Sequence, residues 1–188
     1  MIHTSLIRDT FEYFAKFPDL AGVLKSFNRS SGSKLYPADY QEFKAKIEVL
    51  DPNSQIPGIK DYVFGVNEEL AMKRIKEFSD YYLLVDYGSV STDEDQEYKT
   101  KTDTFLMAVT VAVPLLSTSY DEVEALLHAD QALTYLQKIR SQMLADKNCN
   151  LLKHIEFPSE ITPFFSREML NSIGFTMLFT KMGIGLLG

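Results

Sequence analysis

The clearest pattern of hydrophobic positions lies in the second half of the chain. Residues Thr104 to Val113 alternate between larger and smaller side chains, which predicts a strand with one face toward the core. The larger side chains of that face are Met107, Val109, Val111 and Val113. After Pro114 the spacing becomes helical, and we expect a helix from about Tyr120 to Asp146. Ser119 and Glu122 have the spacing of a capping box at its start.

The expected helix carries apolar residues at intervals that place them near one face. These residues are Val123, Leu126, Leu127, Leu133, Leu136, Ile139, Met143 and Leu144. Such a face is typical of a helix that packs on a core. We expect Leu133 and Leu136 to be buried, because they continue the series that starts at Val123. This helix and the strand before it form the centre of the predicted fold.

The first fifty residues predict shorter elements. Residues 4 to 17 place aromatic side chains near one helical face, and Pro18 ends that helix. We expect a short strand at Gly22 to Phe27. The segment from Tyr36 to Leu50 fits a helix that starts at Pro37, or a strand in its second half. We favour a strand from Phe43 to Leu50, because apolar and charged residues alternate there.

The middle of the chain predicts a strand, a short helix and a long hairpin. Asp61 to Val66 reads as a short strand, and Asn67 is placed to cap the helix that follows. The helix residues expected to point inward are Leu70, Ile75 and Phe78. Tyr81 to Val90 predicts a strand that pairs with the long strand in an antiparallel hairpin. The acidic, Thr-rich segment from Ser91 to Thr102 is expected to be the mobile end of this hairpin.

The C-terminal part predicts the remaining strands. Residues Leu151 to Phe157 and Ile161 to Phe165 are expected to form an edge strand or irregular extended segments, because Pro158 and Pro163 interrupt them. Phe175 to Met182 predicts the last strand. The whole pattern predicts a single α+β domain over residues 1–188, with a mixed, mainly antiparallel sheet, a long β-hairpin packed against one long helix, and shorter N-terminal helices.

Composition narrows the class of protein. The 188 residues carry a net charge of -7, which argues against direct binding to the phosphates of a nucleic acid. A single cysteine, Cys149, rules out an internal disulfide and fits a reducing compartment. Charged residues interrupt the N-terminal segment where a signal peptide is apolar, and no apolar run is long enough to span a membrane. We therefore expect a cytoplasmic protein without a membrane partner.

Few residues have the spacing of a catalytic or metal site. Glu124 and His128 lie four residues apart on the predicted helix and would supply half of a metal site, but no third ligand has a recognisable spacing. Cys149 and His154 could form a nucleophile and base, although no nucleophile motif surrounds them. His3 has no suggested partner. Surface or loop positions explain these residues more simply, so we expect no catalytic residue, metal or cofactor.

The acidic residues of the hairpin allow two interpretations. The cluster is Asp93, Glu94, Asp95 and Glu97. Its charge resembles that of a calcium loop, but the glycine at the sharp turn and the closing bidentate glutamate are missing. A solvated hairpin end is the simpler interpretation. Neither glycine-rich phosphate-binding motif occurs in the chain.

The order of the predicted elements, with the segments YYLLVDYGSV, TFLMAVTVAVPL and NSIGFTMLFT, resembles the tail-terminator and tail-completion (head-tail joining) proteins of long-tailed phages. The resemblance covers roughly Asp61 to Met182. It implies a prophage-encoded virion component, without catalytic residues, that forms a ring, commonly a hexamer, and contacts tail-tube or connector proteins. Under this hypothesis the contact residues on the hairpin are Asp93, Glu94, Asp95 and Tyr98. The alternative is a small enzyme or ligand-binding domain whose site combines residues distant in sequence.

Overall fold

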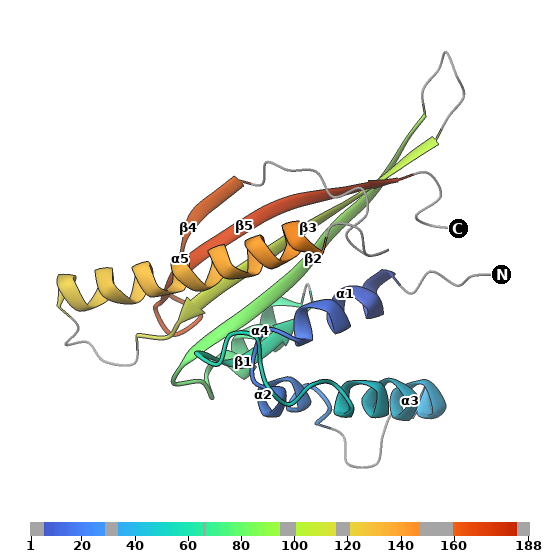
Figure 1. Cartoon of the computed structure of the whole chain (residues 1–188), viewed down its shortest axis with the longest axis horizontal. Helices are drawn as coiled ribbons and strands as arrows, with labels where there is room; N and C mark the ends of the chain where they lie inside the picture. The colour runs from blue at the N-terminus through green and yellow to red at the C-terminus, as the bar shows by residue number, and fades with distance from the viewer. Residues whose placement is uncertain are drawn as a thin grey trace.

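The computed structural model describes residues 6–28, 34–65, 67–94, 101–115, 121–146 and 160–183. In these residues the chain forms an α+β fold around a five-stranded sheet, as predicted (Figure 1). The helices are α1 (Leu6–Ala15), α2 (Leu20–Leu24), α3 (Pro37–Glu48), α4 (Glu68–Ile75) and α5 (Glu122–Ala145). The strands are β1 (Ile59–Phe64), β2 (Tyr81–Glu94), β3 (Lys101–Val113), β4 (Glu160–Ser166) and β5 (Ser172–Gly183).

The strands follow the order β1-β2-β3-β5-β4 across the sheet. Only β1 and β2 run parallel, and α4 connects them, as a parallel pair requires a crossover. The predicted hairpin of β2 and β3 is confirmed, with paired residues from Tyr82 and Ala112 out to Glu94 and Lys101. The predicted edge strand at Ile161 to Phe165 is β4, whereas the segment from Leu151 to Phe157 lies outside the described residues.

One face of the sheet carries most of the core. Helices α1 and α5 both cover it, and Figure 1 shows α5 lying along the strands. Of the β3 side chains predicted to face the core, Met107, Val109 and Val111 are buried there, in one cluster with side chains of α5 such as Leu136 and Ile139. Val113 is buried outside this cluster. Phe14 of α1 reaches the same core and lies 6.3 Å from the ring of Phe179 on β5. The period-two pattern therefore identified the buried face of β3 correctly.

Helix α4 covers one end of the opposite face. Its residues Ala71 and Ile75, and Phe78 just after it, are buried against side chains of the sheet that include Tyr82 and Ala112. The predicted cap is confirmed, because the Asn67 side chain accepts a hydrogen bond from the Leu70 amide at 2.9 Å. Leu70 itself was predicted to point inward, but 61% of its surface is exposed. The short neighbour Ala71 occupies the contact position instead.

Helix α5 departs from the prediction over its first turns. Figure 1 shows that these turns project beyond the ends of the strands. The apolar residues there, Val123, Leu126 and Leu127, are consequently exposed. Burial starts at Ala132 and includes Leu136, while Leu133 is half-buried. The helix cap is Asp121, which accepts a hydrogen bond from the Glu124 amide at 2.7 Å, and the predicted cap residue Ser119 lies outside the described residues.

Two predicted N-terminal strands are wrong. The first half of the segment from Gly22 to Phe27 belongs to helix α2, and the second half follows that helix without forming a strand. Gly22 lies so close to β1 that an added Cβ would be 2.0 Å from the Lys60 carbonyl oxygen. The segment from Phe43 to Leu50 belongs to helix α3 as far as Glu48, where that helix, which starts at Pro37, ends. Its apparent alternation came from exposed residues such as Val49. Phe43 and Ile47, which are one helical turn apart, reach the core from α3, and Leu50 reaches it just after the helix ends.

A polar cluster joins the ends of α1 and α5. The carboxylate of Asp146 accepts hydrogen bonds from Lys16 at 2.5 Å, Tyr13 at 3.0 Å and Gln142 at 2.8 Å. Burial alone raises the pKa of Asp146, but the hydrogen bonds from these three side chains outweigh it and lower the pKa. The carboxylate therefore ties the two helices that cover the main core.

We expect Leu136→Ala to lower the free energy of unfolding by about 2–5 kcal/mol, because it leaves a cavity under α5. Leu126→Ala is the matched control on the exposed part of the same helix, and its effect should stay within about 0.5 kcal/mol. Urea denaturation of the two variants measures the difference. Equal effects of the two substitutions would contradict the packing of α5 on the core through Leu136.

We expect Asp146→Asn to destabilise the protein by about 1–2 kcal/mol at pH 7, because it removes the charged acceptor. Since the pKa of Asp146 is lower in the folded state, its contribution is present above the ordinary value of 3.8 and is lost as the pH falls through the folded value. Thermal midpoints of both proteins between pH 7 and pH 2 test this. If the thermal midpoint of Asp146→Asn stays below that of the parent protein by the same amount at the lowest pH, the electrostatic explanation is contradicted.

Candidate functional site

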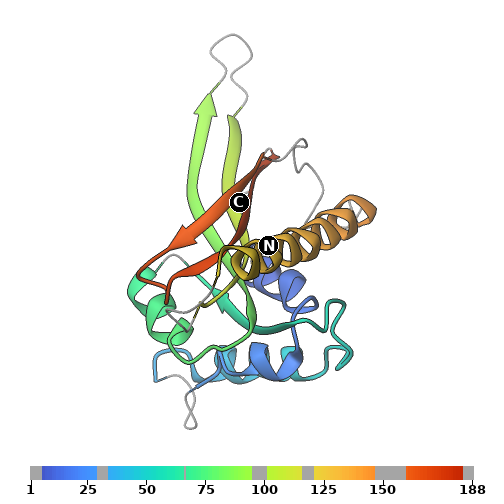
Figure 2. The same ribbon diagram turned by 90° about the vertical axis from the view of Figure 1, so that its left-hand side faces the viewer.

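The outer part of the hairpin has an open strand edge. Strand β1 pairs with β2 only as far as Val85, so Asp86 to Glu94 have β3 on one side and no strand on the other among the described residues. Every residue from Gly88 to Glu94 is exposed. Figure 2 shows the hairpin rising away from the helices. We call residues 86–94 the β2 edge.

The hairpin strands extend further than predicted. Ser91 to Glu94, expected in the mobile end, belong to β2 and pair with β3. Of the expected contact residues, Asp93 pairs with Thr102 and Glu94 pairs with Lys101, and both acids are exposed. The other expected contact residues, Asp95 and Tyr98, lie outside the described residues, and so does Glu97. The predicted mobility of residues 95–100 also concerns a segment outside the described residues, so it stays a prediction.

Strand β4 forms the opposite edge of the sheet. It pairs with β5 on one side and has no strand on the other in the part of the chain that the structure describes. Pro163 lies within it, which fits an edge position because proline lacks an amide hydrogen. Phe165 is 60% exposed on this strand. We call residues 160–166 the β4 edge.

The β2 edge begins with a half-buried acid, Asp86. One carboxylate oxygen of Asp86 is inaccessible to solvent and has no hydrogen-bond partner among the described residues. Burial raises the pKa of Asp86 above its ordinary value. The register of the hairpin also shifts between Tyr87 and Val90, as in a β-bulge. A partly buried charge and a bulge are two features that discourage unspecific pairing at an open edge.

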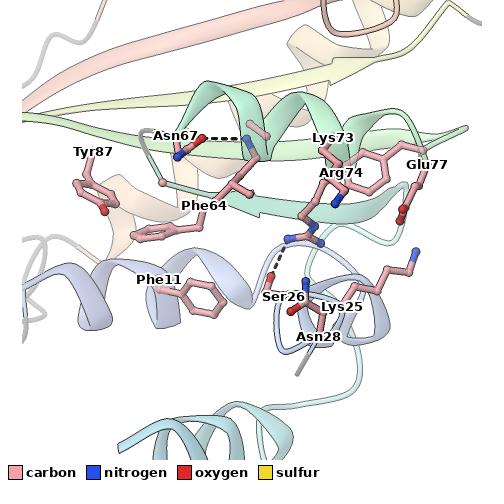
Figure 3. Close-up of a pocket in the computed structure, with 14 residues that line it drawn as sticks. Phe11, Lys25, Ser26, Asn28, Phe64, Asn67, Lys73, Arg74, Glu77 and Tyr87 are labelled. Carbon is pink, nitrogen blue, oxygen red and sulfur yellow. Dashed lines mark hydrogen bonds between the residues drawn. The ribbon is translucent and has the colours of Figure 1, made fainter. Parts of the chain in front are cut away.

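A groove lies between α4 and the segment formed by α1 and α2 (Figure 3). Its volume is about 980 Å³. Phe11, Phe64 and Tyr87 lie toward one end, and Lys25, Ser26 and Arg74 lie toward the other. We call this cavity the basic groove. It combines residues from α1, α2, β1, β2 and α4, which are far apart in sequence.

Glycine and asparagine shape the junction of β1 and α4 beside the groove. Gly65 has a φ of 124°, a backbone conformation that side chains other than glycine strongly disfavour. Its amide donates a hydrogen bond to the Val85 carbonyl at 3.0 Å, which holds the end of β1 against β2. The chain then enters α4 at the cap residue Asn67. This turn directs α4 back along the groove.

Arg74 reaches across the basic groove. Its Nη1 donates a hydrogen bond to Ser26 Oγ at 2.9 Å, and Figure 3 shows the side chain directed from α4 toward Ser26. Its Nη2 is buried and has no acceptor among the described residues. Burial lowers the pKa of Arg74, against the opposite effect of the Asp61 and Glu77 carboxylates. Lys25 pairs with Asp61 at 2.6 Å at the same end.

The residues weighed for metal or nucleophile chemistry do not form a cluster within the described parts. Glu124 is exposed, and His128 Nδ1 is hydrogen-bonded with Tyr81 Oη at 2.8 Å. No three His, Cys, Asp or Glu side chains of the described residues come together as metal ligands. Cys149, His154 and His3 lie outside the described residues. No helix of the described segments is long and apolar enough to cross a membrane.

Sequence patterns did not identify the basic groove. The only local signal is the adjacent cations Lys73 and Arg74, which resemble an ordinary charged helix surface. Ser26 and Phe64 become lining residues of the groove only because the fold places α2 and β1 beside α4. Comparison with family models, curated proteins and solved structures finds no match to this chain. The geometry of the described residues therefore carries the functional argument.

We expect Asp86→Asn to raise the thermal midpoint at pH 7, because it removes a desolvated charge. Since burial raises the folded-state pKa, the charge costs stability above that pKa, and the gain should disappear as the pH falls below the ordinary value of 3.8. Asp93→Asn is the matched control at an exposed position of the same strand. A lower midpoint for Asp86→Asn at pH 7 contradicts this account.

Proposed function

We propose that this protein is a non-enzymatic assembly subunit that associates with copies of itself through the hairpin and the edges of its sheet. The observation that carries the proposal is the pair of open edges, the β2 edge and the β4 edge, on opposite sides of one sheet. Tail-terminator proteins of long-tailed phages are the class that the sequence resembles, and a ring is the assembly expected of that class.

Two different edges favour a head-to-tail contact. If the β2 edge of one subunit meets the β4 edge of the next, each subunit uses one surface of each kind. Such a heterologous contact generates a closed ring when its rotation closes on itself. Backbone groups that are open in the separate subunit then gain partners. The proposal is a cyclic assembly, with a hexamer as the expected form.

Exposed apolar residues provide a second argument for association. The β4 edge carries Phe165, and the projecting turns of α5 carry Val123, Leu126 and Leu127. Large apolar side chains gathered at exposed elements commonly mark protein interfaces. Under this proposal the acids Asp93 and Glu94 near the end of the hairpin would meet a basic surface of a neighbour or of a tail-tube or connector protein, or would discourage wrong pairing. Their charge would affect the rate of association more than its strength.

We expect the purified chain to sediment well above its monomer mass of 21.4 kDa, and to form rings visible by electron microscopy. Phe165→Ser should weaken this association by at least about tenfold, since exposed aromatic side chains often dominate interface energies. Val49→Ser is the matched control, because Val49 is also an exposed apolar residue but lies next to α3, away from β4. A strict monomer at high concentration, or equal weakening by both variants, contradicts the proposal.

A further inference from the structure

We propose that the basic groove binds a small organic anion, a molecule with an apolar or aromatic body and a carboxylate, phosphate or sulfonate head. This inference does not depend on self-association. It rests on the groove that Figure 3 shows between α4 and the segment formed by α1 and α2. The volume of about 980 Å³ is within the usual range for small-molecule sites, about 300–1,000 Å³.

The unmet hydrogen-bonding capacity of Arg74 identifies the position of the anionic head. A guanidinium carries five N–H donors. Nη1 donates to Ser26 Oγ, while Nη2 is buried without an acceptor among the described residues. Leaving a buried charged donor without a partner is costly, and an anionic oxygen is its strongest acceptor. Nη2 is closed to solvent in this structure, so a small rotation of the guanidinium brings it to an anion in the groove, which would complete the coordination of this side chain.

The charges around Arg74 favour the same ligand. The chain has a net charge of -7, yet three cationic side chains, Lys25, Lys73 and Arg74, line the groove with one acid, Glu77. Asp61 balances the charge of Lys25, and the cations still outnumber these two carboxylates. Lys25 is held by Asp61, which fixes the ammonium group at that end. Ser26 also lines the groove and offers a hydroxyl beside the guanidinium. A local excess of cations in an acidic protein attracts anions to this groove.

The other end of the groove is suited to an aromatic body. The ring of Phe64 lies 5.2 Å from that of Phe11 and 5.3 Å from that of Tyr87. These ring contacts hold the three side chains together, so that they form one apolar surface of the groove. Leu70 adds an exposed apolar side chain at the rim. A ligand with its head at Arg74 would place its body against these rings.

Fluorescence titration of the full-length protein with 8-anilinonaphthalene-1-sulfonate tests the proposal. This probe carries two aromatic ring systems and a sulfonate. N-phenyl-1-naphthylamine has the same rings without the sulfonate. We expect saturable one-to-one binding of the sulfonate, and Arg74→Met should weaken it by at least about tenfold while leaving the neutral probe unaffected. Equal weakening of both probes, or no effect on either, would overturn the assignment of Arg74 to the head.

Two further variants separate binding from folding. Leu70→Glu places an acid at an exposed rim position, so it should weaken binding of the sulfonate probe by charge repulsion without lowering the thermal midpoint of the protein. Lys138→Met is the control, because it removes a cation that lies 5.8 Å from the Tyr135 ring on α5, outside the groove. It should leave both affinities unchanged. Sulfonate binding that survives Leu70→Glu but is lost in Lys138→Met would place the probe elsewhere and contradict the proposal.

Competition against the bound sulfonate distinguishes the possible heads. Displacement by 1-naphthyl phosphate would show that the site accepts a phosphate head, and displacement by 1-naphthoate would show that it accepts a carboxylate head. Both outcomes support the groove as an organic-anion site. Failure of both compounds to displace the sulfonate would contradict it, because each combines an aromatic body with an anionic head.

Discussion

The pairing of β3 with β2 on one side and β5 on the other is the constraint on which the rest of the structure depends. The ladder to β2 runs from Lys101 to Ala112, and the ladder to β5 runs from Asp103 to Val113. Fixing this register places one set of alternating side chains on a single face, and a shift of one residue would reverse it. Helices α1 and α5 then pack on that face, and Asp146 joins their ends.

The same elements that build the core leave part of the sheet incomplete. Strand β1 is shorter than β2, so it covers the inner part of β2 and leaves the β2 edge open among the described residues. Helix α2 packs beside β1, where the Asp19 amide bonds to the Ile59 carbonyl at 2.9 Å. Among the described residues, open backbone lies at the β2 edge, at the β4 edge and at residues 179–183 of β5, which extend past the end of β4. An assembly through these edges explains why the hairpin extends beyond the packed body.

Sequence periodicity predicted the elements whose burial follows a regular pattern. Strands β3 and β5 and helix α5 each have a long apolar repeat, and each was located from the sequence. Helix α3 was misread as a strand because Ala45 and Val49 are exposed, so their apolar character carried no information about burial. The prediction that the first turns of α5 pack on the core was wrong for the same reason, because their apolar residues are exposed. Hydrophobic spacing identifies a face but does not show where its covering partner ends.

The basic groove could not be predicted by such reasoning, because Arg74, Ser26 and Phe64 meet only through tertiary packing. The edges were easier to anticipate, since the hairpin and Pro163 are local features. What the sequence did not show is that β1 stops pairing at Val85. That single boundary determines how much of β2 is open.

Hydrogen-deuterium exchange at several protein concentrations tests the central claim about the β2 edge most directly. Amides of residues 82–85, which lie between β1 and β3, should be protected at every concentration. In residues 86–94, amides that point away from β3 should exchange rapidly in dilute protein and become protected as subunits associate. Rapid exchange of those amides in a concentrated, associated sample would contradict assembly through this edge.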